Sequence, residues 1–405
     1  MSPQNPRQPN EQQPTPKALP GILDGIRVLD FSAFISGPYC ARMLADIGAE
    51  VIKVEPPGGE LLRYAPPLRE ASDGPAASGL FAHLNAGKRC ISLDLKKAAA
   101  VEAIYALVAQ CDVVVENFSP GVMKRLGLDY DTLVKYNDKL IMCSISGFGQ
   151  TGPEATRPAF APIVQAWSGF ELSYINAQPG IEKPLNMGPP VADTTASLQA
   201  FGAICAALYH RERTHKGQYI DISMYDALIS TVHKDFQQAL QPLDNDRYYG
   251  PLKTKDGWIV IMVLSERHLT GLAKVLNQPE LTSDPRFSSP VARLDNYSTL
   301  MAITEIFTAT KTTEWLDKQF NAATVPSSAY RELAASVDDL QLRHRNMITE
   351  VTDNAGPVTV TNSPFSFSAT SAAIRPWVAG IGEHNEIIFK DEIGLTPEEL
   401  ENLGV

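Results

Sequence analysis

Residues 26–55 read IRVLDFSAFISGPYCARMLADIGAEVIKVE, and this stretch decides the fold class. Residues 26–31 form a short β-branched and apolar run, which favours a strand. Ser36 can cap a helix and Pro38 is tolerated in a first helical turn, so we predict a helix over residues 39–47. Gly48 ends that helix, and residues 50–55 are a second strand-like run. The stretch therefore predicts a strand–helix–strand unit, the building block of a parallel sheet.

The same alternation continues along the chain. Further strands are predicted at residues 90–93, 113–116, 140–145 and 219–223, and helices at 98–109, 121–126, 162–170, 194–213 and 225–240. Strands that alternate with helices at this spacing indicate an α/β fold with a parallel sheet and helices on its faces. In such sheets ligands bind outside the carboxyl ends of the strands.

The length of the chain predicts more than one domain. It has 405 residues, 44% of them hydrophobic, which is more than one ordinary core requires. We expect a disordered Pro- and Gln-rich tail over residues 1–19, a large domain over 20–241 and a linker at 241–250. A smaller α/β domain is expected over 250–335, with a strand at 257–263 and helices at 266–276, 297–308 and 313–320. Short extended runs at 358–361 and 365–367 and a helix at 398–402 complete the expected elements.

Composition excludes several classes of protein. The net charge of −11 argues against nucleic acid and anionic membranes as partners. The five cysteines contain no C-x-x-C pair and the seven histidines no paired metal spacing, so we expect neither a disulfide framework nor a metal site. No long uncharged apolar run and no signal-peptide pattern is evident, so we expect a cytoplasmic protein.

Asp193 is the carboxylate of most chemical interest. It follows a Gly-Pro-Pro loop and lies at the predicted start of a long helix, whose N-terminus stabilises negative charge. An ionised carboxylate there can attack a thioester carbonyl. Asp is also a preferred N-cap, and on the local pattern alone the capping role is favoured.

Two loops at the predicted carboxyl edge are further candidates. Residues 147–152 match G-x-G-x-x-G, but Pro153 follows instead of a helix, so we expect a glycine loop lining a cleft and not a dinucleotide site. Residues 117–121 follow a buried strand. There Phe118 could pack on a flat ring and Arg125 could bind phosphate, although a core Phe and a solvated helix face explain the same pattern.

Several motifs together resemble the class III CoA-transferases of the CaiB/BaiF type. They are residues 25–31, 36–38, 44–59, 85–89, 112–121, 146–153 and 165–169. The resemblance extends over nearly everything after Pro20. It implies a Rossmann-like large domain and a small domain, with residues 340–405 returning to the large domain. It further implies an interlocked dimer, with a hetero-oligomer as the alternative.

By motif position, Asp193 in the sequence VADT matches the nucleophilic aspartate of that family. The resemblance implies that it attacks an acyl-CoA to give an aspartyl mixed anhydride and CoA thiolate. CoA then joins the aspartyl group, and a second carboxylic acid collects it. The positions matched to CoA contacts are Ile35, Leu93, Asn117, Phe118, Arg125, Ser146 and Gly147. CoA is here a substrate, and no permanently bound cofactor is expected.

Two departures from the family pattern bear on the chemistry. Phe160 and Ala161 stand where the racemase branch of the family has a His-Asp pair, which disfavours α-proton transfer. Ala161 also leaves open a slower transferase, an engineered change or a non-catalytic subunit of a hetero-oligomer. Ile35 stands where formyl-CoA transferase carries Gln. This difference argues against oxalate as the substrate. The donor and acceptor acids are not identified by the sequence.

Overall fold

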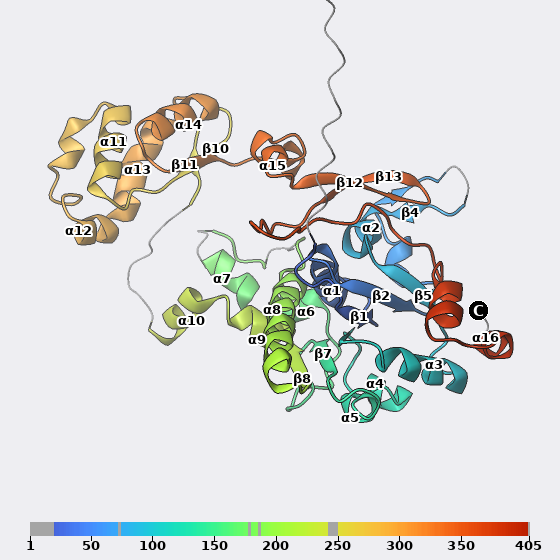
Figure 1. Cartoon of the computed structure of the whole chain (residues 1–405). Coiled ribbons are helices and arrows are strands. Elements are labelled where there is room, and N and C mark those ends of the chain that lie inside the picture. The colour runs from blue at the N-terminus through green and yellow to red at the C-terminus, as the bar shows by residue number, and fades with distance from the viewer. Residues whose placement is uncertain (1–19, 72–73, 177–179, 185–187, 242–249, 404–405) are drawn as a thin grey trace, which may run out of the picture. The chain divides into compact units, whose positions relative to one another are not determined.

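The computed structural model describes residues 20–71, 74–176, 180–184, 188–241 and 250–403 (Figure 1). The predicted tail over residues 1–19 and most of the predicted linker, 242–249, lie outside the described residues. Contacts group the chain into two compact units. Unit 1 comprises Met1–Gln165, Gly188–Leu228 and Asn346–Val405, and unit 2 comprises Ala166–Met187 and Ile229–Arg345.

Unit 1 is built on a six-stranded parallel sheet of order β5-β2-β1-β6-β7-β8. Its strands are β1 (Arg27–Asp30), β2 (Glu50–Glu55), β5 (Arg89–Ser92), β6 (Val113–Glu116), β7 (Ile141–Ser146) and β8 (Gln218–Ser223). Counted along the chain this is the order 3-2-1-4-5-6, the doubly wound arrangement of dinucleotide-binding folds. The direction of the order reverses between β1 and β6.

The register of the central strands follows from their β-branched residues. Val28 of β1 pairs with Val51 of β2 and with Val113 of β6, and all three are fully buried. Strands covered by helices on both faces read as continuous apolar runs, because neither face meets water. The predicted parallel α/β sheet is therefore confirmed.

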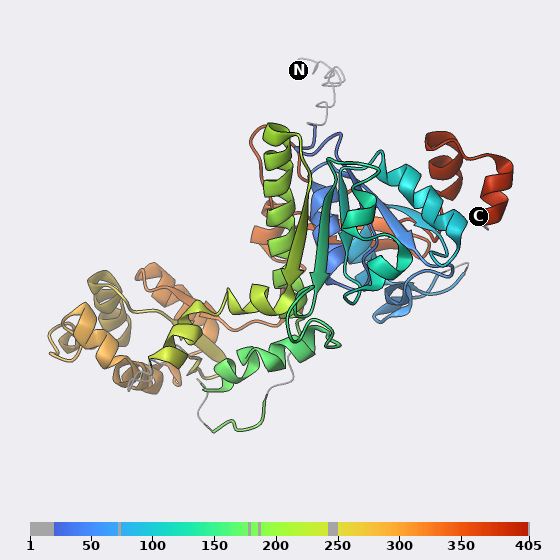
Figure 2. The ribbon, with the colours of Figure 1, turned by 90° about the horizontal axis from the view of Figure 1, so that it is seen from below.

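Helices pack on both faces of this sheet. On one face, α3 (Ala98–Val108), α16 (Pro397–Leu403) and a π-helical turn (Ile387–Glu392) enclose an apolar core with the strands. On the other, α1 (Ser36–Asp46) packs against α8 (Val191–Thr214), which runs beside β7 and β8 (Figure 2). The short helices α4 (Val122–Leu126) and α5 (Tyr130–Leu133) connect β6 to β7.

Two smaller layers complete unit 1. A 3-10 turn (Leu61–Tyr64), the hairpin β3 (Leu68–Arg69) and β4 (Ala77–Ser78), and α2 (Gly79–Asn85) lie between β2 and β5 in sequence. The C-terminal hairpin of β12 (Ile348–Asp353) and β13 (Gly356–Thr361) packs its valines against α2. The short helix α6 (Ala161–Trp167) begins in unit 1.

Unit 2 has its own core around a three-stranded antiparallel sheet. The strands are β9 (Leu252–Lys253), β10 (Trp258–Ile261) and β11 (Ser327–Ala329), in the order β11-β10-β9. The helices are α7 (Phe170–Asn176), α10 (His233–Leu240), α11 (Glu266–Leu276), α12 (Pro290–Asp295), α13 (Tyr297–Thr308), α14 (Thr313–Ala322) and α15 (Leu340–His344), with α9 (Met224–Ile229) at the junction in sequence. Leu269, Leu300 and Phe320 lie among its fully buried residues. The predicted domain boundaries stay predictions.

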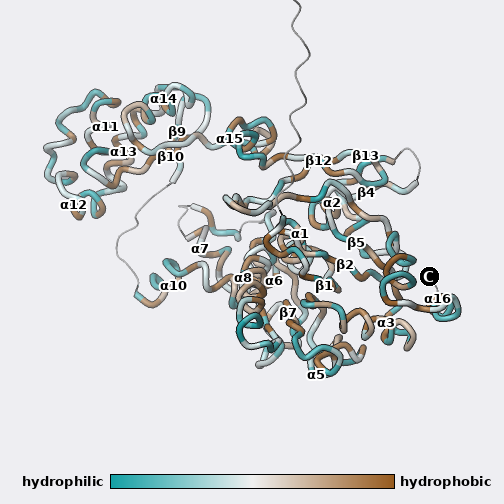
Figure 3. Tube along the Cα trace, in the orientation of Figure 1, coloured by the Kyte–Doolittle hydropathy of each residue, from teal (hydrophilic) through white to brown (hydrophobic). Residues whose placement is uncertain are grey.

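Three sequence predictions need correction. The single helix predicted over residues 225–240 is two helices, α9 and α10. Ser230 and Thr231 lie between them, and the side chains of such residues can form hydrogen bonds with the backbone that compete with those of a helix. The extended run predicted at 365–367 forms no strand. Contrary to the expectation from hydropathy, α8 is long and apolar enough to span a membrane. Its buried residues include several alanines, and its last turns, with the sequence YHRERT, are hydrophilic. Figure 3 shows the hydropathy along this helix.

Candidate functional site

The candidate active site lies where the strand order of unit 1 reverses. The loops that follow β1 and β6 leave the sheet side by side at its carboxyl edge. Asn117 joins them, because its side-chain oxygen accepts from the Ala33 N–H at 2.8 Å and its amide nitrogen donates to the Ala33 carbonyl at 2.8 Å. This reversal point is the position at which open α/β sheets bind their ligands.

Asp193 stands in the first turn of α8. The helix begins at Val191, three residues earlier than the sequence predicted, and its N-cap is Pro190. Asp193 is therefore not the cap, so the capping role that its local pattern favoured is wrong. The side-chain oxygen of Gln165 instead accepts a hydrogen bond from the Ala192 N–H at 3.3 Å, within the first turn.

The Asp193 carboxyl group meets the first loop through Ser36. The Ser36 hydroxyl donates a hydrogen bond to it and lowers its pKa, but burial is the larger influence and raises the pKa to about 6. Asn117 donates to the same hydroxyl oxygen at 3.1 Å. The resulting chain of hydrogen bonds runs from Asn117 through Ser36 to the carboxylate. A half-buried carboxylate with a raised pKa is more basic than a solvated one and is still ionised at neutral pH.

A second serine, Ser197, connects α1 and α8 next to this contact. The buried Ser197 hydroxyl lies 2.7 Å from the Ser36 carbonyl of α1 and 2.8 Å from the Asp193 carbonyl of α8. Both carbonyls accept from this one hydroxyl. The first turns of α1 and α8 are thereby held in a fixed relation, and so are the side chains they carry.

The predicted CoA-contacting residues lie at this edge of the sheet with different exposures. Ile35 precedes α1 as its N-cap, and Phe118 directly follows Asn117 with its ring against the apolar core. Arg125 lies in α4 and is exposed. The Leu93 side chain is only 2% exposed in the core after β5, so its main chain alone remains available for contact.

The loop after β7 holds the other two predicted residues. Ser146 ends the strand, and its buried hydroxyl has no hydrogen-bond partner among the described residues. Gly147 is required sterically, since a Cβ there would lie 2.4 Å from Ala159 Cβ. No helix opens from residues 147–152; turns and bends run on to α6. The helix that a dinucleotide-binding motif requires therefore does not follow this loop.

Phe160 and Ala161 lie between this loop and Asp193 in sequence. Ala161 is buried at the start of α6, whereas Phe160 is 65% exposed. The Phe160 ring meets the half-exposed ring of Phe34 edge to face, with the centroids 5.8 Å apart. Among the described residues, no group of three His, Cys, Asp or Glu side chains is placed to hold a metal ion.

Sequence reasoning missed the part that serines play at this site. Ser36 was interpreted as a helix cap, but it lies inside α1 and is directed at Asp193. Ser197 falls four residues after Asp193, one helical turn further on, and this spacing was the available signal. Their partners are 157 and 161 residues away in sequence, so only the fold reveals the pairing.

The fold and site define a doubly wound α/β enzyme with a carboxylate at the switch point. Comparison with known proteins agrees. The model of CoA-transferase family III matches residues 23–385. A succinyl-CoA:mesaconate CoA-transferase of Haloarcula hispanica is 35% identical over 394 residues, which span 93% of this chain and 97% of that protein. A succinyl-CoA–D-citramalate CoA-transferase of Chloroflexus aurantiacus is 33% identical, covering 94% and 96%.

A solved structure supports the same assignment. A CaiB/BaiF family protein from Brucella suis superposes with a TM-score of 0.79 at 30% identity, covering 92% of this chain and 100% of that one. The chain belongs to CoA-transferase family III, and CoA transfer is its enzymatic activity. The resemblance read from the motifs is confirmed, and CoA thioesters are its substrates.

Proposed function

We propose that this enzyme transfers CoA from an acyl-CoA to a free carboxylate through covalent intermediates on Asp193. The observation that carries the proposal is the position of Asp193 at the switch point, half-buried and hydrogen-bonded by Ser36. Burial makes the carboxylate more nucleophilic than one in water, and the hydrogen bond orients one oxygen and leaves the other free to attack.

The steps balance without an external acid or oxidant. The carboxylate attacks the thioester carbonyl of the donor, which forms a mixed anhydride and expels CoA thiolate. The thiolate attacks the aspartyl carbonyl of that anhydride, so the donor leaves as its carboxylate and an aspartyl thioester remains. The acceptor carboxylate attacks this thioester to give a second anhydride and thiolate. Attack of the thiolate on the acceptor carbonyl releases the new acyl-CoA and restores Asp193.

We assign CoA binding to the carboxyl edge of the sheet. Arg125 is suited to a phosphate and Phe118 to the flat adenine ring, while Asn117 and Ile35 line the reacting end. The Ser146 hydroxyl, which has no hydrogen-bond partner in the described part of the chain, is available to a ligand beside Gly147. The Leu93 main chain completes the set. Succinyl-CoA is the first donor to test, because both relatives described above are named for it.

We further propose the assembly that the family resemblance implies. It consists of an interlocked cytoplasmic homodimer in which each chain has a large domain over residues 20–241, a small domain over 250–335 and a return segment over 340–405. A hetero-oligomer in which this chain is the non-catalytic partner is the alternative, motivated by Ala161. Full activity of the pure chain, measured together with its molar mass in solution, would exclude that alternative.

The nucleophile can be tested by trapping. The enzyme is mixed with succinyl-CoA and either hydroxylamine or borohydride, and the peptide containing Asp193 is analysed by mass spectrometry. We expect a hydroxamate or a reduced side chain at Asp193 in the wild type and neither in Asp193→Ala. Transfer to a panel of dicarboxylates with no modification at Asp193 would overturn the assignment.

A further inference from the structure

The loop that carries the contact to Asp193 has an unusual backbone. Phe34, between Ala33 and Ile35, has a φ of 62°, in the left-handed region that non-glycine residues rarely occupy. A conformation of this kind persists only where surrounding groups impose it, and such residues cluster at functional sites. Phe34 is also 40% exposed, so burial of its ring does not explain the strain.

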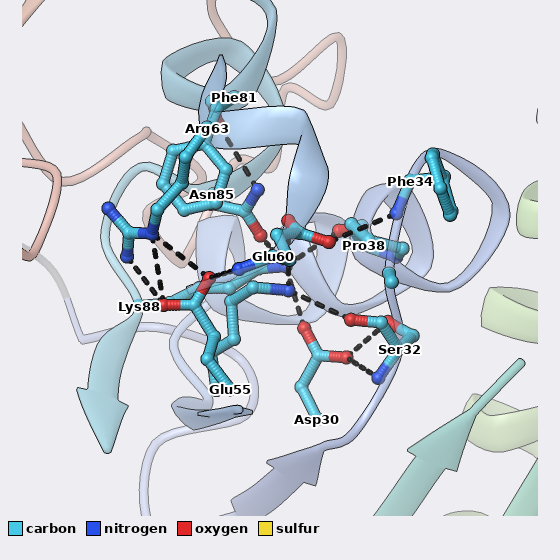
Figure 4. A network of polar contacts seen from close by, with 12 residues as sticks. Asp30, Ser32, Phe34, Pro38, Glu55, Glu60, Arg63, Phe81, Asn85 and Lys88 are labelled. Carbon is cyan, nitrogen blue, oxygen red and sulfur yellow. Dashed lines mark hydrogen bonds and ion pairs between the residues drawn. The ribbon is translucent and has the colours of Figure 1, made fainter. Parts of the chain in front are cut away.

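Side chains from three elements hold this loop at successive residues. The Lys53 ammonium of β2 donates to the Ser32 carbonyl at 2.8 Å. The Asn117 side chain forms hydrogen bonds with both the N–H and the carbonyl group of Ala33, as described above. The Glu60 carboxylate, from the segment after β2, accepts the Phe34 N–H at 3.1 Å (Figure 4). The strained residue is thus bonded directly to Glu60.

Glu60 belongs to a buried network of charges beneath the loop. It is 5% exposed, and its second oxygen lies 3.3 Å from the Lys53 ammonium, at ion-pair distance but without hydrogen-bond geometry. Deeper still, Lys88 binds Asp30 at 2.8 Å (Figure 4). A neutral oxygen could accept the same single hydrogen bond from this N–H. A buried carboxylate does so at an additional cost, because its charge must be removed from water. What the carboxylate adds is a stronger, charge-assisted hold on Phe34.

We propose that Glu60 is a positioning residue for the Asp193 nucleophile. By holding the Phe34 N–H, it fixes the turn that places Ser36 two residues later, and Ser36 carries the hydroxyl bonded to Asp193. Glu60 does not touch the reacting groups; it acts through the loop. This inference rests on the proposed role of Asp193.

Two substitutions separate the hydrogen bond from the ion pair. Glu60→Leu removes both, whereas Glu60→Gln keeps an oxygen that can accept from Phe34 and loses only the charge. Asp46→Asn is the matched control. Asp46 is a carboxylate of α1 that is also buried at 6% exposure, paired to a single arginine, Arg42, and it lies at the far end of the helix from Ser36.

Single-turnover acylation of Asp193 by succinyl-CoA, followed by trapping, measures positioning directly. We expect Glu60→Leu to slow it about tenfold, the effect of losing one charge-assisted hydrogen bond, while Glu60→Gln stays within about threefold of the wild type. Asp46→Asn should keep the wild-type rate although its thermal midpoint falls. KM for succinyl-CoA should change less than kcat in Glu60→Leu.

Hydrogen–deuterium exchange gives a readout independent of activity. We expect the Phe34 amide to exchange about tenfold faster in Glu60→Leu than in the wild type, and at the wild-type rate in Asp46→Asn. Wild-type acylation of Asp193 in Glu60→Leu would overturn the positioning role while leaving the nucleophile intact. An active wild type that is never labelled at Asp193 would instead overturn the proposed function. Equal slowing in Glu60→Leu and Asp46→Asn would show that the network is structural only.

Discussion

Replacing Ser36 by alanine should change how the enzyme responds to pH. In the wild type, burial raises the pKa of Asp193 to about 6, and the Ser36 hydroxyl opposes that rise by hydrogen-bonding the carboxylate. In the proposed mechanism only the ionised carboxylate attacks the thioester. The acylation rate of the wild type should therefore rise about tenfold per pH unit below pH 6 and level off above pH 7.

The size of the change follows from the lost hydrogen bond. A bond to a charged acceptor contributes about 1.5–3 kcal/mol, and about 1.4 kcal/mol corresponds to one pKa unit. Water entering the half-buried site replaces part of this bond, so we expect the midpoint of Ser36→Ala to move upward by about one pH unit. At pH 5.5 this variant should then be about tenfold slower than the wild type, and the pH-dependent part of the difference should vanish above pH 8.

The assay is single-turnover trapping of Asp193 with succinyl-CoA from pH 5 to 9, read by quantitative mass spectrometry. Ser197→Ala is the matched control, since its hydroxyl binds only main-chain carbonyls and leaves the carboxylate untouched. We expect it to lower the plateau without moving the midpoint. A Ser36→Ala profile with the wild-type midpoint would refute the reasoning, because the hydroxyl would then not stabilise the ionised carboxylate.

Three further substitutions test stability and packing. The pKa of Asp193 is raised from 3.8 to about 6, so the folded state binds the proton more tightly and this group lowers stability as pH rises from 4 to 6. Asp193→Asn should consequently gain about 1–3 kcal/mol of unfolding free energy at pH 7.5, measured by urea denaturation, and no gain at pH 4. Lys88→Met leaves Asp30 buried without its ammonium partner and should lose about 3–5 kcal/mol in the same assay. Gly147→Ala forces its Cβ against Ala159 and should cost about 1–3 kcal/mol, with slower CoA transfer.

The fold was largely predictable because its signals are local. The apolar runs of β1, β2 and β6 and the caps and glycines between them are read within a window of a few residues. The π-helical turn Ile387–Glu392 and the helix α2 carry weaker local signals and were missed. The break between α9 and α10 depends on two residues, Ser230 and Thr231, whose helix propensity is only moderately low.

The site was predictable only in part, because its contacts are distant in sequence. Asp193 was identified by its resemblance to a family motif; physical reasoning from its local sequence favoured a helix cap, which it is not. Lys53 lies near the end of a strand-like run, where the sequence alone does not distinguish it from a surface charge, and the structure buries it beside Glu60. Charged residues at the end of an apolar strand carry no local sign of burial, since burial depends on what packs above them.

The first turn of this sheet explains why a nucleotide-binding architecture can support carboxylate chemistry. In dinucleotide-binding folds that turn is glycine-rich, and its backbone approaches a pyrophosphate. Here Phe34, Ile35 and Ser36 occupy it, and Asn117 and Glu60 satisfy its backbone groups instead of a ligand. A turn fixed from beneath by side chains can hold Ser36 toward the first turn of α8 before any substrate arrives. In the proposed mechanism Asp193 is therefore already oriented when the thioester binds, and the binding energy of CoA need not be spent on arranging it.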